Sequence, residues 1–288
     1  FPNLALMKLS ACHKARGDEI LLLNFIMGAE TIYGSCVFPK NAKRERLPGE
    51  AIVGGTGFGK GEWLPDEIEH IMPDYGLYGT DYSMGFTSRG CIRRCSWCIV
   101  PGKEGHIRPW ATIYEFWDRR HARIRLLDNN LLAAPNWRET LETLIGEGLR
   151  VDFNQGLDLR LVTAENAALL AKVKRTAELR FSFDSLGMEE SVRRGIGYLI
   201  EAGIRPSQLM VYVLIGYWDP EDDLARLRIL ADLGVAVFPM NYQPLPKMPA
   251  ARTEIGPGRA WLGDFPLFRG PRASYQKALR LTKARMGL

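Results

Sequence analysis

The stretch QLMVYVLIGYWDPEDDLARLRILADLGVAVFPMNYQ, residues Gln208–Gln243, predicts a strand, a helix and a second strand in succession. Its first nine residues are almost continuously apolar, which is typical of a strand buried on both faces of a sheet. Pro220 and the acidic residues Glu221–Asp223 suit the first turn of a helix, because proline is tolerated there and carboxylates interact favourably with the helix dipole. Two strands joined by a helix of this length favour a parallel sheet.

The same alternation extends back toward the amino terminus. Helical patterns start at the capping residues Asn136 and Thr163 and stop at Gly148 and Gly203. The predicted strands are Met84–Gly90, Arg123–Asn129, Arg150–Gly156, Glu178–Asp184, Gln208–Gly216 and Val235–Gln243. The predicted helices are Asn136–Gly148, Thr163–Arg175, Met188–Gly203 and Pro220–Gly234. Six strands are too few for the usual closed eight-stranded barrel. We therefore expect an α/β fold with an open or partial barrel.

The ends of the chain differ from this central pattern. Residues 1–79 predict a small, incomplete α/β region, with a helix and a strand in Asn3–Ile20, a strand at Ala51–Gly55 and a short helix after Leu64. The segment from Pro246 is rich in proline and glycine and closes with the basic helical pattern Ala273–Met286. The predicted organisation is thus 1–79, a small amino-terminal region; 80–245, the partial barrel; and 246–288, a carboxy-terminal extension.

Composition limits the location and the partners. No apolar run approaches the roughly 20 residues that a membrane span needs, so we expect no membrane partner. Five cysteines is an odd number and three of them are clustered, which favours a reducing cytoplasm over a secreted disulfide framework. The net charge of +5 permits nucleic acid as a partner without arguing for it.

Polar residues gather where the predicted strands end. In parallel α/β folds, functional groups lie in the loops after the carboxyl ends of the strands. Here these loops carry Asp128–Asn130, Asn154–Arg160, Phe183–Ser185, Gly216–Asp219 and Asn241–Gln243. The run Asn154–Arg160 is the most polar after an apolar strand, and we expect Asn154, Gln155, Asp158 and Arg160 to recognise the substrate, with cofactor contacts or loop capping as the alternative.

The loop after the first predicted strand, RGCIRRCSWCIVPGKEG (Arg89–Gly105), holds Cys91, Cys95 and Cys98. A structural zinc site takes four ligands, commonly as two pairs, and an iron–sulfur electron carrier takes four thiolates. Three thiolates on one loop can instead hold three irons of a cubane cluster and leave the fourth iron open to a ligand. A non-catalytic iron–sulfur or zinc protein remains the competing class. Cys12 and Cys36 stand alone and are expected to be small buried hydrophobes.

With Trp97 before its last cysteine, the pattern C-x3-C-x-aromatic-C resembles the hallmark of the radical SAM superfamily. The resemblance covers roughly Asp81–Gln243 and implies a (βα)6 partial TIM barrel. It implies that Cys91, Cys95 and Cys98 hold a 4Fe–4S cluster whose open iron chelates S-adenosylmethionine. Electron transfer from a reductant such as flavodoxin or ferredoxin would then cleave this cofactor to methionine and a 5′-deoxyadenosyl radical, which abstracts hydrogen from a substrate that the sequence does not identify.

The resemblance also implies roles for residues that follow the strands. The methionine amino group would be bound by Asp128, Asn129 and Asn130, although the glycines usual at this position are absent. The ribose would be bound by Ser182 and Asp184, with a helix cap as the alternative role for Asp184. The adenine would contact Trp97, Ile215 and Gly216, and Arg194 would bind a carboxylate.

Two absent sequence features, a second group of cysteines and a cobalt-ligand motif, limit which branch of the superfamily the chain resembles. GCIRRCSWCIVPGKEG is locally similar to methylthiotransferases, but those carry three further cysteines ahead of the motif, where this chain has only Cys12 and Cys36. Residues 1–79 resemble a shortened cobalamin-binding domain of class B radical methylases. The D-x-H-x-x-G motif that supplies the cobalt ligand is absent, which argues against cobalamin. Because of the resemblance of residues 1–79, a cobalamin-dependent radical methyltransferase remains the alternative function.

Overall fold

In the computed structural model, residues 2–22, 28–38, 41–59 and 63–242 are described. The chain divides into two compact units, one comprising Phe1–Gly85 with Ala111–Ile124 and the other Phe86–Trp110 with Arg125–Leu288. We call them the amino-terminal unit and the second unit. The predicted basic helix Ala273–Met286 and the extension 246–288 lie outside the described residues.

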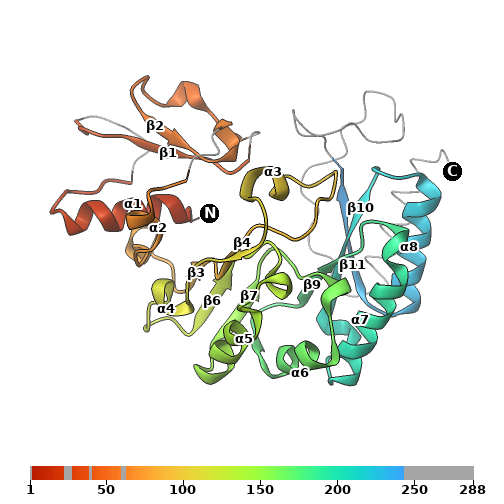
Figure 1. Ribbon diagram of the computed structural model, residues 1–288. Coiled ribbons are helices and arrows are strands. Elements are labelled where there is room, and N and C mark those ends of the chain that lie inside the picture. The colour runs from red at the N-terminus through yellow and green to blue at the C-terminus, as the bar shows by residue number, and fades with distance from the viewer. Residues whose placement is uncertain (1, 23–27, 39–40, 60–62, 243–288) are drawn as a thin grey trace. The chain divides into compact units, whose positions relative to one another are not determined.

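The amino-terminal unit is a small α/β layer (Figure 1). Its helices are α1 (Leu4–Ala15), α2 (Asp66–Glu69) and α4 (Ile113–Phe116), and its strands include β1 (Tyr33–Ser35), β2 (Ile52–Gly54) and β3 (Ser83–Gly85). β1 and β2 pair in parallel. The predicted helix at the amino terminus and the strand at Ala51–Gly55 are confirmed, whereas the described residues Asp18–Leu22 form no strand.

Tyr75 anchors the core of this unit. Its hydroxyl donates to the backbone oxygens of Phe116 and Met84, and it accepts from the Met84 nitrogen at 3.0 Å. Burial raises the pKa of Tyr75 to about 12.

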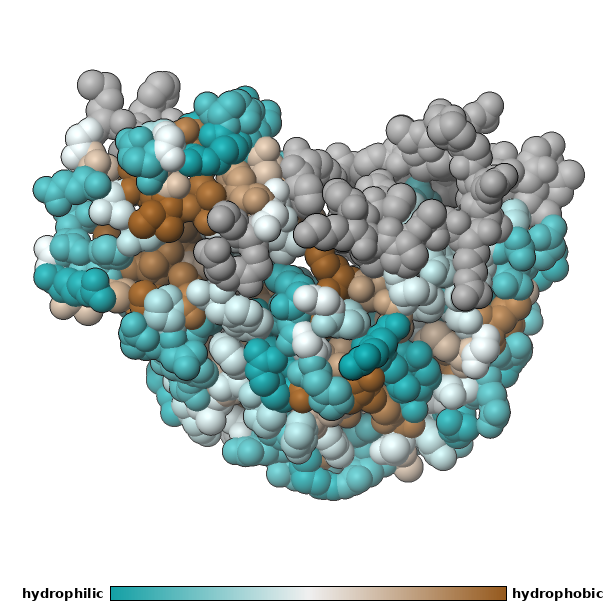
Figure 2. Space-filling view, turned by 45° about the horizontal axis from the view of Figure 1, so that its top comes forward, coloured by the Kyte–Doolittle hydropathy of each residue, from teal (hydrophilic) through white to brown (hydrophobic). Residues whose placement is uncertain are grey.

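Figure 2 shows hydrophobic surface on the same unit, where Val37, Phe38 and Ile52 are exposed.

The second unit contains the predicted βα alternation, and its sheets are mainly parallel. The strands are β6 (Arg123–Leu126), which begins in the other unit, β7 (Arg150–Phe153), β8 (Lys174–Arg175), β9 (Leu179–Ser182), β10 (Leu209–Ile215) and β11 (Ala236–Asn241). Helices α5 (Trp137–Gly146), α6 (Ala164–Lys172), α7 (Glu189–Glu201) and α8 (Pro220–Asp232) lie along one side of them (Figure 1). One sheet has the order β3-β6-β7-β8 and the other β11-β10-β9. In the second sheet, Val211 of β10 faces Phe181 on one side and Val237 on the other.

A single bridge links these two sheets. Leu157, just beyond β7, pairs in parallel with Phe181 of β9, and its nitrogen donates to the Arg180 oxygen at 2.7 Å. Gly156 precedes the bridge with φ of +86°, a left-handed conformation that favours glycine. The described strands therefore follow the order β6-β7-β9-β10-β11 across the bridge, with β8 paired beside β7 and no closed barrel among them.

Local signals predicted the helices well. Thr163 caps α6 together with Asn166, and Pro220 opens α8. Gly148 and Gly203 adopt positive φ just past the ends of α5 and α7. Asn136 sits at the cap position of α5, but its side chain does not cap that helix. Its amide instead donates to the Thr87 oxygen at 3.0 Å, across the unit from its own helix.

The first predicted strand, Met84–Gly90, is interrupted and forms β3 and β4 (Ser88–Arg89). The reason is the buried carboxylate of Asp128, which accepts hydrogen bonds from the backbone nitrogens of Thr87 and Ser88 and from both hydroxyls. The Thr87 nitrogen, which lies in the break between β3 and β4, is thereby lost to a strand ladder. None of the described helices has the length and apolar character to cross a membrane.

Candidate functional site

The segment Gly90–Gly105, here called the cysteine loop, starts and ends at the same point of the second unit. Its neck is the antiparallel pair of β4 and β5 (Arg108–Pro109). The Cys91 nitrogen donates to the Gly105 oxygen at 3.2 Å. Gly90 has φ of +83°, and a Cβ there would lie 2.3 Å from the His106 oxygen, so only glycine fits. The loop contains one short helix, α3 (Val100–Glu104).

A buried ion pair fastens this neck. Arg89 Nε donates to Glu104 Oε2 at 2.7 Å, and its Nη2 donates to Oε1 at 3.3 Å. The Arg89 guanidinium also lies 3.9 Å from the ring centroid of Phe86. Asn129, which follows β6, donates to Glu104 Oε2 at 3.1 Å. The loop is therefore tied to the end of the neighbouring strand as well as to its own neck.

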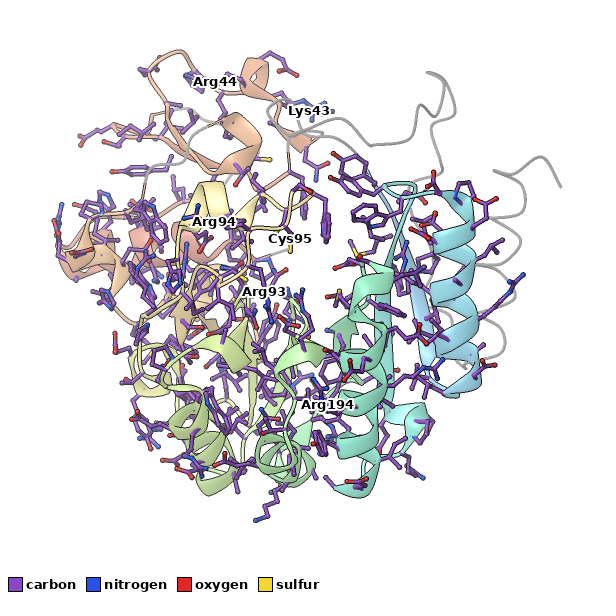
Figure 3. All side chains as sticks on the ribbon, turned by 45° about the vertical axis from the view of Figure 1, so that its right-hand side comes forward. Lys43, Arg44, Arg93, Arg94, Cys95 and Arg194 are labelled. Atoms are coloured by element: carbon purple, nitrogen blue, oxygen red, sulfur yellow. The ribbon has the colours of Figure 1, made fainter. Side chains whose placement is uncertain are left out.

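The three cysteines line one pocket, which lies wholly within the second unit. Its walls come from the cysteine loop and from the segments at the carboxyl ends of β6, β7 and β9. The lining residues are Cys91, Arg93, Cys95, Trp97, Cys98, Pro101, Asn129, Asn130, Gln155, Gly156, Leu157, Asp158, Arg160, Phe181, Ser182 and Asp184. Figure 3 labels Arg93 and Cys95 on this loop.

All three thiols are free and partly exposed. Cys91 Sγ accepts from the Arg93 nitrogen at 3.3 Å and from Asn130 Nδ2 at 3.4 Å. Burial raises the pKa of Cys95 and of Cys98. A metal that binds these sulfurs would oppose this effect, because it stabilises the thiolate.

Cysteines hold two kinds of metal group, a single metal ion and an iron–sulfur cluster. Within the described residues, no three or more His, Cys, Asp or Glu side chains are arranged to hold a metal ion. In a cubane cluster each thiolate binds a different iron, so its ligands surround a cavity and do not converge on one atom. Three free thiols that line one pocket fit the cluster in donor type and number.

Asn130 adds a second feature that fits a bound cofactor. Its Oδ1 is buried and has no hydrogen-bond partner in the described structure, although its amide nitrogen is used by Cys91. A buried acceptor without a donor is costly, by about 1–3 kcal/mol. Asn130 also lines the pocket. The pocket therefore offers an unsatisfied acceptor next to a cysteine, where a ligand amine could donate.

Ser182 and Asp184 line the same pocket from the end of β9. Burial raises the pKa of Asp184, whereas the positive charge of Arg226 and a hydrogen bond from Ser182 act to lower it. Arg226 is fully buried on α8 and donates to the backbone oxygens of Phe183 and Leu214, at 2.9 and 2.8 Å. This arginine thus fixes the ends of β9 and β10 beside the pocket.

Trp97 packs into an aromatic cluster with Tyr217, Trp218 and Tyr242. Its ring centroid lies 5.1 Å from that of Tyr217 and 5.9 Å from that of Trp218. Tyr217 is buried, and its hydroxyl shares a hydrogen bond of 2.6 Å with Ser96. The cluster connects the cysteine loop to the loop after β10. Its later members were not singled out from sequence, although Tyr217 and Trp218 belong to a loop expected to be functional.

Two arginines share one carboxylate in the pocket. Arg160 donates from Nε and Nη2 to Asp158 at 2.7 and 2.9 Å, and Arg93 Nε donates to the same carboxylate at 3.1 Å. Burial of Asp158 would raise its pKa, but the hydrogen bonds and charges of Arg160 and Arg93 outweigh burial and lower it. Arg93 was not singled out from sequence, because nothing in its loop predicts a partner 65 residues away.

Most of the residues expected at the site line the pocket, and five of them do not. Asp128 is buried outside the lining and accepts hydrogen bonds from the hydroxyls of Thr87 and Ser88. Arg194 lies on the surface of α7, paired with Glu190 at 3.1 Å and apart from the cysteine loop (Figure 3). The Gly216 nitrogen donates to Asp223. The other two residues outside the lining are Asn154 and Ile215.

No protein-family model matches the chain, and no curated protein matches it significantly. The residues of the pocket and the spacing of the cysteine motif are therefore the observations that bear on function.

Proposed function

We propose that this protein is a radical SAM enzyme with a (βα)6 partial barrel over residues 80–245. The observation that carries the proposal is that Cys91, Cys95 and Cys98 line one pocket at the carboxyl ends of β6, β7 and β9. The fold assignment is supported by the strand order, because β6 and β7 are neighbours in one sheet, β9, β10 and β11 are neighbours in the other, and the Leu157–Phe181 bridge joins the segment after β7 to β9.

Cys91, Cys95 and Cys98 would hold a 4Fe–4S cluster, and the pocket between them and the strand ends would hold S-adenosylmethionine. Together these groups would supply reductive cleavage of the sulfonium to methionine and a 5′-deoxyadenosyl radical that abstracts hydrogen from the substrate. The required electron would come from a protein reductant such as flavodoxin or ferredoxin. Free thiols that must bind iron suit a reducing compartment, so a cytoplasmic location is part of the proposal.

The residues of the chain would bind and orient these groups. Asn130 Oδ1 offers an unused acceptor for the methionine amine beside Cys91. Trp97, held by Tyr217 and Trp218, offers an aromatic surface to the adenine. Ser182 and Asp184, at the end of β9, offer acceptors to the ribose hydroxyls. Each group lines the pocket from a different segment, which would fix the orientation of the cofactor.

The test begins with anaerobic reconstitution of the protein with iron and sulfide, followed by measurement of both. About four irons and four sulfides per chain are expected, whereas one tightly bound zinc would support the structural-metal alternative. The reduced protein should then convert S-adenosylmethionine to 5′-deoxyadenosine, even slowly and without substrate. A correctly loaded protein that yields only methylthioadenosine or S-adenosylhomocysteine would contradict the proposal. Cys95→Ser is the matched variant that should lose both cluster and cleavage.

A further inference from the structure

We propose that Arg93 and Arg160 form a subsite for an oxyanion group of the substrate, either a carboxylate or a phosphate. The word substrate rests on the proposed function, whereas the anion site itself rests on the pocket geometry alone. Both arginines line the pocket, one from the cysteine loop and one from the segment after β7.

Asp158 orients the two guanidinium groups. Its Oδ1 accepts from the Arg160 nitrogen and Nε, and its Oδ2 accepts from Arg160 Nη2 and Arg93 Nε. Four donors occupy the roughly four lone-pair positions of a carboxylate. Asp158 is also buried. Asp158 is therefore a positioning residue, because no lone pair is left to accept from a ligand. The arginines that it orients would contact the substrate directly.

Both arginines keep donors that the described protein does not use. The hydrogen bonds of Arg93 engage Nε, and those of Arg160 engage Nε and Nη2. Arg93 Nη1 and Nη2 and Arg160 Nη1 have no partner among the described residues. These side chains are 32% and 25% exposed, so their free nitrogens can be reached from the pocket. A guanidinium edge matches two oxygens of a carboxylate or a phosphate, which a single ammonium does not.

The local charge favours the same kind of ligand. Two guanidiniums and one carboxylate leave one positive charge in excess, and the pKa of Asp158 is lowered, so this carboxylate stays ionised. Asp184 is the other carboxylate of the pocket; burial raises its pKa, whereas the charges of Arg226 and Arg160 act to lower it. An anion bound between the arginines would complete their hydrogen bonds in a partly desolvated site, where such bonds are stronger than in water.

The substrate is favoured over the cofactor as the source of this anion. Under the proposed function the carboxylate of S-adenosylmethionine already has the open iron as its cationic partner through one oxygen, whereas Arg93 and Arg160 are the cationic side chains that the described pocket lining offers to a substrate oxyanion. The second carboxylate oxygen of the cofactor is the alternative ligand of the arginines. A substrate oxyanion and the cofactor carboxylate would make the same hydrogen bonds to the arginines. The test therefore has one arm that detects anion binding and a second arm that decides which of the two molecules carries the anion.

The first arm uses the chain without cluster and without cofactor. Inorganic phosphate and succinate are titrated calorimetrically at low salt into the parent and into Arg160→Gln, Arg93→Gln and Arg94→Gln. Arg94 is exposed on the same loop and does not line the pocket, so it is the matched control. We expect at least one of the two anions to bind the parent. Its dissociation constant should rise roughly tenfold in both pocket variants, as expected for loss of a charge-assisted hydrogen bond, and stay unchanged in Arg94→Gln.

Arg160→Lys keeps the charge but loses the two hydrogen bonds to Asp158 that orient this side chain, and it should restore only part of the affinity. Thermal unfolding of each variant reports whether it folds. If a glutamine variant does not fold, the affinity of Arg160→Lys still tests the site. Absence of phosphate and succinate binding to the parent, or equal loss in Arg94→Gln, would overturn the subsite. These results are read without the cluster, so failure of the proposed function would leave them standing.

The second arm uses the reconstituted protein with S-adenosylmethionine and with its decarboxylated analogue. If the anion belongs to the substrate, Arg160→Gln should bind each cofactor as the parent does. A variant that weakens the binding of S-adenosylmethionine but not that of the decarboxylated analogue would assign the arginine to the cofactor carboxylate and overturn the substrate assignment.

Discussion

Asn130 donates its amide proton to Cys91 Sγ at 3.4 Å while its own Oδ1 stays buried without a partner. The two halves of one side chain thus differ, since the nitrogen serves a cysteine and the oxygen is left for a ligand. Asn129, one residue earlier, donates instead to Glu104. The two asparagines therefore connect the end of β6 to opposite ends of the cysteine loop.

Asn130→Ala should weaken the binding of S-adenosylmethionine by roughly tenfold, or about 1.4 kcal/mol, while iron content is kept. The reason is that the cofactor amine would lose its acceptor. Equilibrium binding to the reconstituted protein measures the effect, and Asn154→Ala, after β7 but outside the pocket lining, is the control. Asn129→Ala should have a similar effect. Parent-like binding in both variants would mean that the amine is held elsewhere.

Replacing Cys12 and Cys36 together with alanine should leave iron content and the visible absorption of the cluster unchanged. Neither residue lines the pocket, and Cys36 Sγ instead contacts the Phe38 oxygen at 3.3 Å. Iron analysis after reconstitution measures the result, with Cys98→Ser as the variant that should lose the cluster. Loss of iron in the double variant would show that the ligand set is larger than three.

Glu104→Gln should lower the free energy of unfolding by about 3–5 kcal/mol, because it leaves the buried Arg89 without its charge partner. Urea unfolding monitored by tryptophan fluorescence measures the change. Glu142→Gln is the matched control, since Glu142 pairs with Arg138 on the exposed face of α5 and should cost less than about 1 kcal/mol. Equal effects of the two substitutions would argue against a stabilising neck.

Stability should fall at alkaline pH through Tyr75. Its pKa is raised from 10.0 to about 12, so the folded chain keeps this proton in a range where the unfolded chain loses it. The contribution is fully present below pH 10 and is lost as the pH rises toward 12, by up to about 3 kcal/mol. Urea unfolding between pH 8 and pH 11.5 tests this. Tyr75→Phe should flatten the decline, whereas the exposed Tyr114→Phe should not.

Much of the α/β alternation was predictable because its signals are local. The apolar run of β10, the cap at Thr163 and the glycines after α5 and α7 each depend on a few neighbouring residues. The gathering of three cysteines at one edge followed from the motif and from the general position of sites in parallel sheets.

The parts that were missed depend on partners distant in sequence. Asp128 has the same side-chain chemistry wherever it points, and only the fold directs it to Thr87 and Ser88 instead of the pocket. Arg93 and Asp158 meet across 65 positions, and no local pattern encodes that distance. Arg226 would be expected on the exposed face of a helix, yet it is fully buried because two backbone oxygens and Asp223 accept its protons.

The single bridge between Leu157 and Phe181 has a mechanical consequence. Asn130 is carried by the sheet that contains β6, whereas Ser182 is carried by the sheet that contains β9. Each sheet has its own ladder of hydrogen bonds, and the bridge between them is reinforced by the ion pair of Arg180 on β9 with Asp152 on β7, at 2.6 Å. The width of the pocket is thus set at the seam where two separate ladders meet, beside Gly156, whose left-handed backbone favours glycine.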